Sequence, residues 1–300
     1  MFEIELDMFS GLPNPRWELE GKEADAFIAR IVANRRQVRS LRSIGPVLGY
    51  RGYIVRAYGE TARRLAASGI PPVFRISSLP EELAPSEQDA LSGFEGQTLA
   101  SEPEDGEETI DEFDGLPRPV PGTCSLAYTR WNDFSFWNGS RQENNNCYCY
   151  AANYAANHFG MPGRKAGQGL LLGSRTINYR DKPTAGEFTE AMRADGWRTG
   201  CTGKSLRITA VMAKITRHSD GHLFWDFHFY RKNLVTSTNA VRWCHKAGET
   251  PATNKDASGN YITSVQNADR TFSDPFFHYD YWQVVDTYFT APEVTSLRID

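Results

Sequence analysis

Residues 142–169 read QENNNCYCYAANYAANHFGMPGRKAGQG, and the second half of the chain is organised around them. Three asparagines precede Cys147, and asparagine is a preferred N-cap because its side-chain oxygen accepts a free N–H of the first helical turn. The alanines that follow favour helix, while Gly160 and Pro162 end it. The sequence predicts a short helix from Cys147 to about Phe159.

Cys147 is a candidate nucleophile because of this position. The dipole of a helix favours negative charge at its N-terminus, and the thiolate is the reactive form of cysteine. The alternative is an inert side chain, since cysteine within an aromatic cluster commonly packs as a small apolar residue.

Composition excludes several classes of protein. The 300 residues are 40% hydrophobic and carry a formal net charge of −4, so no overall basic field suggests nucleic acid. No apolar run approaches the roughly 18 residues of a membrane span. The start, MFEIELDMFSG, is acidic where a signal peptide is basic. We expect a soluble protein without a cofactor, either cytoplasmic or exported without a cleavable signal peptide.

The five cysteines do not predict disulfides or a structural zinc site. Their number is odd, and Cys147 and Cys149 form C-x-C instead of C-x-x-C.

The first 98 residues predict a small α/β domain with a binding or regulatory role. Strand and helix patterns alternate over residues 1–10, 21–40, 50–58, 60–68, 72–77 and 85–93. Residues 99–122 are acidic and then proline-rich, which predicts an extended linker. A second domain is expected over residues 123–300.

Two strands of the second domain place a histidine on a polar face. Residues 206–217 alternate, a D-G turn signal follows, and residues 222–231 return. Side chains alternate along a strand, so one face is apolar and belongs to the core. We expect the other face to border a cleft or solvent; it carries His222, Phe224, Asp226, His228 and Tyr230.

His228 is the expected base for Cys147. A thiol nucleophile needs a base within hydrogen-bond reach, and the base needs an orienting partner. Three downstream residues could orient the imidazole: His245, Asn254 and Asp256.

This order resembles that of the papain-like cysteine hydrolases, and within them the bacterial cysteine/histidine-dependent amidohydrolase/peptidase branch. Residues 147–153, CYCYAAN, are similar to the C-x-x-Y-A-x-N opening of its helix, and His228 matches its base by topology. The C-G-S-C-W signature of papain is absent, and His228 stands between two phenylalanines where the branch has small residues. The resemblance covers about half of the second domain.

The resemblance implies a papain-like α+β domain with an antiparallel sheet packed on the cysteine helix. It implies hydrolysis of an amide or peptide bond through a thiolate and an acyl-enzyme, with a peptide or amide-containing substrate. The implied catalytic residues are Cys147, His228, Asn254 and Gln142, and Gln142 or one of residues 144–146 would donate to the oxyanion. The expected substrate-binding residues are Asn146, Trp137, Tyr148 and His245. An intramolecular contact with the N-terminal domain is a further expected partner.

Two other interpretations remain open. Asp226 and His228 could bind a metal together with His218 or His245. Alternatively the chain is a non-enzymatic binding or toxin-associated module in which Cys147 is a core residue. Reactivity of the thiol distinguishes these from an enzyme.

Overall fold

The computed structural model divides the chain into two compact units. Unit 1 contains Met1–Phe9 and Pro13–Gly96, and unit 2 contains Ser10–Leu12 and Gln97–Asp300. The structure describes residues 1–12, 14–43, 48–79, 125–126, 134–157, 159–163, 185–198, 204–219, 221, 223–235, 239–271 and 277–290. The predicted helix at 85–93 and the predicted linker at 99–122 lie outside these residues.

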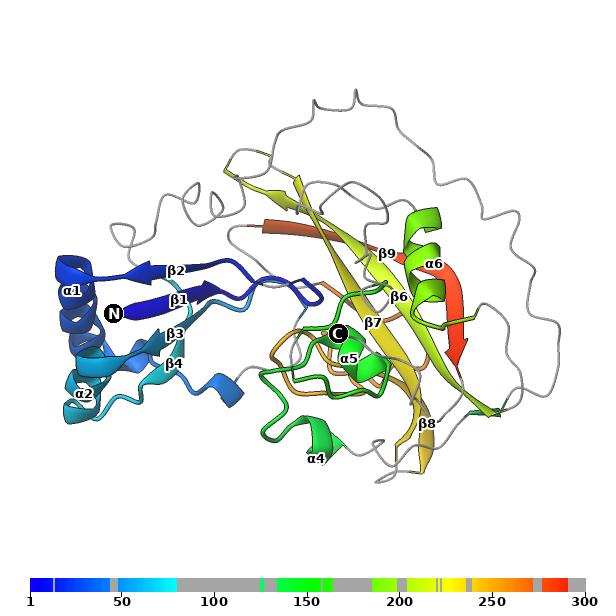
Figure 1. Cartoon of the computed structure of the whole chain (residues 1–300), viewed down its shortest axis with the longest axis horizontal. Helices are drawn as coiled ribbons and strands as arrows, with labels where there is room; N and C mark the ends of the chain where they lie inside the picture. The colour runs from blue at the N-terminus through cyan, green and yellow to red at the C-terminus, as the bar shows by residue number, and fades with distance from the viewer. Residues whose placement is uncertain are drawn as a thin grey trace. The chain divides into compact units, whose positions relative to one another are not determined.

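Unit 1 is an antiparallel sheet packed against two helices (Figure 1). The strand order is β2-β1-β3-β4, and antiparallel pairing makes the unit α+β where the sequence predicted α/β. The strands are β1 (Phe2–Leu6), β2 (Arg16–Leu19), β3 (Tyr53–Ala57) and β4 (Val73–Ile76). The helices are α1 (Gly21–Ala33) and α2 (Gly59–Ala67), with short 3-10 turns η1 (Arg35–Gln37) and η2 (Leu41–Ser43).

The core of unit 1 consists of apolar residues from one face of the sheet and from both helices. Its fully buried members include Phe2, Ile4, Phe27, Val55, Leu65 and Phe74. Helix α1 ends at Ala33, before the predicted residue 40, because Arg39 instead exchanges two backbone hydrogen bonds of 2.9 Å with Arg75.

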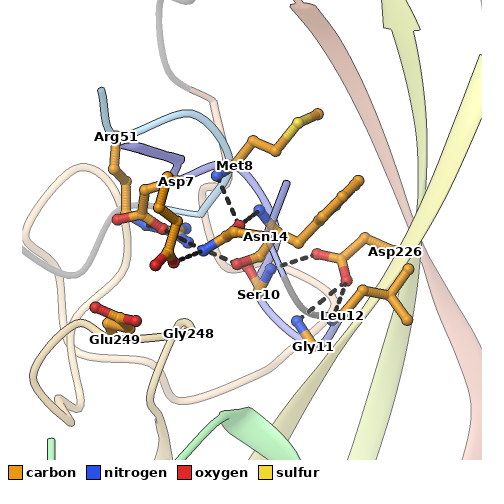
Figure 2. Close-up of polar contacts among 12 residues, drawn as sticks. Asp7, Met8, Ser10, Gly11, Leu12, Asn14, Arg51, Asp226, Gly248 and Glu249 are labelled. Carbon is orange, nitrogen blue, oxygen red and sulfur yellow. Dashed lines mark hydrogen bonds and ion pairs between the residues drawn. The ribbon is translucent and has the colours of Figure 1, made fainter. Parts of the chain in front are cut away.

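A buried ionic cluster lies at the end of β1 (Figure 2). The Asp7 carboxylate contacts Arg51 and Arg75, each at 2.5 Å. Asn14 donates to Glu5 and Asp7 and accepts from the N–H groups of Met8 and Phe9. Burial would raise the pKa of Asp7, but the two guanidinium groups outweigh it and hold this pKa well below its usual range.

Unit 2 is built on a second sheet of order β5-β6-β7-β8, with β9 paired to β6. The pairs are antiparallel except for the short parallel pair β5–β6. The strands are β5 (Ser125–Leu126), β6 (Lys204–Arg217), β7 (Leu223–Val235), β8 (Ala240–His245) and β9 (Phe277–Thr290). The predicted strand pair is confirmed as β6 and β7.

Unit 2 has three short helices, α4 (Phe134–Trp137), α5 (Cys147–Ala151) and α6 (Ala185–Ala194). Helices α5 and α6 pack on the apolar face of β7, while Trp137 of α4 packs against Tyr150 of α5 (Figure 1). The ring of Phe229 lies 4.8 Å from that of Tyr148 on α5 and 5.8 Å from that of Phe188 on α6. The coarse prediction of an antiparallel sheet against the cysteine helix is therefore confirmed.

Helix α5 is shorter than predicted. It ends at Ala151, and Asn153 takes a left-handed φ of 56° that a continuing helix does not allow. The guanidinium of Arg231 on β7 donates to the Asn153 side chain at 2.8 Å and holds this turn against the sheet.

On the opposite face of β7, the described members of the predicted polar set are buried, so the prediction that they border a cleft or solvent is wrong for them. Asp226, His228 and Tyr230 are each at most 1% exposed. The chain after β8 folds back over this face, and Tyr230 packs in a cluster with Ile262 and Val265. Within the described residues, none of the helices is long and apolar enough to cross a membrane.

Candidate functional site

Asn146 caps the helix that begins at Cys147, as predicted. Its side-chain oxygen accepts the Cys149 N–H at 3.2 Å. Its amide nitrogen donates to the carbonyls of Gly11, at 2.7 Å, and Gly160, at 2.8 Å. The buried amide of Asn146 therefore fixes the helix start to two other segments of unit 2.

The Cys147 thiol is enclosed at the edge of β7. Its Sγ lies 3.8 Å from the carbonyl oxygen of Phe227, and the N–H of Phe229 also hydrogen-bonds to it. Burial raises the pKa of Cys147 well above its usual value, and Asp226 raises it further, while the Phe229 N–H and Lys246 lower it. The predicted effect of the helix dipole is thus outweighed, and Cys147 is a neutral thiol at neutral pH.

His228 and His245 form a hydrogen-bonded pair whose proton positions follow from their partners. Nε2 of His228 lies 2.9 Å from Nδ1 of His245, and Nε2 of His245 lies 3.0 Å from the carbonyl oxygen of Lys255. A carbonyl only accepts, so His245 donates from Nε2. Burial lowers the pKa of His245 to about 4, and the ring is neutral with an accepting Nδ1. His228 consequently donates from Nε2 to Nδ1 of His245.

The site brings Cys147 beside the strand segment that carries His228. The two backbone groups at Sγ belong to Phe227 and Phe229, the chain neighbours of His228 on either side. His245 pairs with Tyr230 in the β7–β8 register, which places it diagonally next to His228 on the same face.

The remaining predicted residues have other surroundings. Gln142 donates from Nε2 to the Glu249 carbonyl at 3.1 Å, and Asn254 accepts the Ile262 N–H through its backbone carbonyl. Trp137 is fully buried against Tyr150. Tyr148 is also fully buried, and its hydroxyl donates to Asp195 at 2.5 Å. The two aromatic residues are core residues, because core packing and internal hydrogen bonds occupy their side chains.

The structure adds two charged residues that sequence reasoning did not assign to the Cys147 site. The fully buried ammonium of Lys246 donates to the carbonyls of Gln142, Asn145 and Gly248, which fastens the segment before Cys147 to the segment after β8. Asp226 accepts from three consecutive N–H groups of Ser10–Leu12, at 2.6, 3.1 and 3.2 Å (Figure 2). A lysine directly after a histidine in a glycine-containing loop gives no periodic signal of burial.

In the described part of the chain, no group of three His, Cys, Asp or Glu side chains is placed so that it could hold a metal ion. His222, one of the histidines on the predicted polar face, lies outside the described residues. Cys147, Cys149 and Cys244 are free and buried.

Comparison with known proteins gives one informative match. No family model matches the sequence, and no solved structure matches the chain. The chain is 34% identical over 154 residues to insoluble matrix shell protein 1 of Ruditapes philippinarum, and this alignment covers 51% of the chain and 87% of that protein. The extent and identity of the alignment place the chain in the same family as insoluble matrix shell protein 1.

Proposed function

We propose that unit 2 is a cysteine-dependent hydrolase that cleaves an amide or peptide bond through Cys147 and His228, with His245 orienting His228. The observation that carries this proposal is the 2.9 Å contact between His228 Nε2 and His245 Nδ1. Because that contact uses the Nε2 proton, Nδ1 of His228 is the nitrogen able to accept a proton from a thiol. A cysteine helix packed on an antiparallel sheet supports a papain-like arrangement of these groups.

The reaction follows from this proton placement. Nδ1 of His228 takes the thiol proton while Sγ of Cys147 attacks the substrate carbonyl carbon. The imidazolium then gives the proton to the leaving amine, the C–N bond breaks, and a thioester forms on Cys147. Water deprotonated by Nδ1 attacks the thioester, releasing the carboxylic acid product and re-forming the thiol. Throughout the reaction, Nδ1 of His245 accepts the hydrogen bond from Nε2 of His228 and so stabilises the His228 imidazolium.

Asn146 is the better candidate for the oxyanion donor, together with the N–H of Cys147. Its amide adjoins the nucleophile and already donates to a peptide carbonyl, that of Gly11. Gln142 is the other candidate, and its amide likewise donates to a carbonyl, that of Glu249. The choice of Asn146 therefore rests on its position directly before Cys147. A donor aimed at the developing oxyanion contributes about 3 kcal/mol to transition-state stabilisation.

The test is cleavage of a diverse peptide mixture by the full-length protein, followed by mass spectrometry. Cys147→Ser and His228→Ala should each abolish product formation. His278→Ala is the matched control, because His278 is 62% exposed and should leave cleavage unchanged. Cleavage that persists in Cys147→Ser would contradict the proposal.

A second candidate function is a non-enzymatic matrix module in which Cys147 is a core residue. Two observations favour it: Cys147 is 0% exposed, and the related protein of Ruditapes philippinarum is named insoluble matrix shell protein 1. This candidate predicts concentration-dependent pelleting of the purified protein, unchanged in Cys147→Ser, and no peptide cleavage.

A further inference from the structure

Ser10–Leu12, a short segment of unit 2, is held along the edge of β7 by its main chain (Figure 2). Asp226 accepts from all three of its N–H groups. Asn146 donates to the Gly11 carbonyl at 2.7 Å, and the Gly248 N–H donates to the Ser10 carbonyl at 3.1 Å. Contacts of this kind recognise a peptide backbone, so a peptide of another sequence could make them as well.

Glycine is required at position 11 because the neighbouring atoms leave no room for a Cβ. A Cβ on Gly11 would lie 2.3 and 2.5 Å from two ring carbons of Phe227 and 2.6 Å from the Phe227 carbonyl oxygen. Real Cβ atoms essentially never approach so closely, and two of the three contacts are to an aromatic ring packed in the core. A residue larger than glycine therefore cannot sit here unless the segment moves away from β7.

Ser10–Leu12 and the Cys147 thiol both lie next to the carbonyl oxygen of Phe227. The carbonyl oxygen of Phe227 contacts Sγ of Cys147 at 3.8 Å and borders the space beside Gly11. Asn146, the residue directly before Cys147, holds the Gly11 carbonyl. Asp226, which holds the three N–H groups, also raises the pKa of Cys147. One set of residues thus fixes the segment and sets the state of the thiol.

We propose that Ser10–Leu12 is an intramolecular occupant of the Cys147 site, which covers the thiol in the resting protein and takes the place of an extended peptide substrate with glycine over Phe227. The substrate assignment rests on the proposed hydrolase function, whereas the covering of Cys147 does not. Release of the segment exposes Sγ, the Asn146 amide and the Asp226 carboxylate together.

The first test needs no variant. Alkylation of Cys147 by iodoacetamide is followed by mass spectrometry in the folded and in the unfolded protein. The ratio of the two rates is the protection factor of the thiol. Hydrogen exchange gives the corresponding protection of the Gly11 and Leu12 amides. If release of the segment exposes the thiol, the two protection factors agree within about threefold. Thiol protection that instead equals the protection of the most slowly exchanging core amides overturns the proposal.

The second test is Gly11→Ala, with Gly139→Ala as the matched control. The nearest atom to a Cβ on Gly139 is at 3.6 Å, an ordinary contact, whereas the Cβ on Gly11 collides. Gly11→Ala should speed the labelling of Cys147 by at least about tenfold, since overpacking of this kind commonly displaces a segment. Gly139→Ala should label like the wild type. Equal labelling of both variants, with near-UV circular dichroism showing an intact fold, overturns the proposal.

Synthetic peptides test the substrate assignment. The blocked hexapeptide FSGLPN, which copies residues 9–14, should slow the labelling of Cys147 in Gly11→Ala, whereas FSVLPN should not. If neither peptide protects, the substrate assignment is overturned even when labelling is enhanced. Enhanced labelling together with protection by FSGLPN, but without cleavage of any peptide, would support Ser10–Leu12 as the occupant and contradict the hydrolase proposal. The two proposals can therefore fail separately.

Discussion

His228 Nε2 and His245 Nδ1 lie 2.9 Å apart, and His245 in turn donates to the backbone carbonyl of Lys255. The chain of donors runs from His228 through His245 to a carbonyl, and its direction is set by that last acceptor. The pair therefore determines which nitrogen of His228 can act as a base.

Both rings should be Nε2–H tautomers at neutral pH. Long-range ¹H–¹⁵N spectra of histidine-labelled protein distinguish the two ring nitrogens directly. His245→Asn keeps an acceptor oxygen and should preserve the His228 tautomer, whereas His245→Ala leaves a buried donor unpaired and should destabilise unit 2 by about 1–3 kcal/mol. A His245 signal with the proton on Nδ1 would reverse the direction of the chain and contradict the prediction.

The stability of unit 2 should change little between about pH 4 and pH 6, because two buried groups oppose each other. Burial raises the pKa of Asp226 from 3.8 to about 6 despite its N–H donors, so its contribution is lost as pH rises through this window. Burial lowers the pKa of His245 from 6.5 to about 4, so its contribution is lost as pH falls. Each effect amounts to about 3 kcal/mol.

Asp226→Asn should uncover the contribution of His245. In urea titrations, the unfolding free energy of this variant should rise by about 3 kcal/mol from about pH 4 to pH 6.5. Asp280→Asn is the control, because the side chain of Asp280 is 58% exposed and it should follow the wild type. A pH dependence of Asp226→Asn identical to that of the wild type would show that the opposing contributions are absent.

Lys246→Met should destabilise unit 2 strongly. The methionine fills much of the same volume but leaves the carbonyls of Gln142, Asn145 and Gly248 without the ammonium, which we expect to cost about 3–5 kcal/mol. Lys255→Met is the matched control: Lys255 is exposed, and the change should stay within about 0.5 kcal/mol. Chemical denaturation of the two variants checks the difference, and equal values would refute a structural role for the three hydrogen bonds of the Lys246 ammonium.

Asp7→Asn should weaken unit 1 by about 3–5 kcal/mol, because it leaves Arg51 and Arg75 buried without their counter-ion. The low pKa of Asp7 means that its contribution is present above about pH 4 and is lost as pH falls further, so the variant should also be less sensitive to acid. Hydrogen exchange of unit 1 peptides measures both effects.

Asp25→Asn supplies the comparison for Asp7→Asn. Asp25 pairs with Arg64 in a largely exposed ion pair, which contributes about 0–1 kcal/mol. If Asp7→Asn proves as mild as Asp25→Asn, the buried cluster does not stabilise unit 1.

The sequence by itself determined the features that depend on local chemistry. The alternation of residues 206–217 and 222–231 predicted β6 and β7, and the asparagines before Cys147 predicted the cap that Asn146 makes. These succeed because side-chain period and capping are decided within a few residues of chain. The same periodicity placed Asp226 and His228 on one face.

Only the tertiary structure decided what covers that face and which residues meet there. The β7–β8 register selects His245 as the partner of His228, where the sequence left three alternatives. Ser10–Leu12 reaches Asp226 from more than 200 positions away in the chain. Periodicity tells which residues share a surface but carries no information on the segment that buries it. Such long-range contacts arise from the summed packing of the whole unit, and the burial that they create turned a predicted thiolate into a neutral thiol.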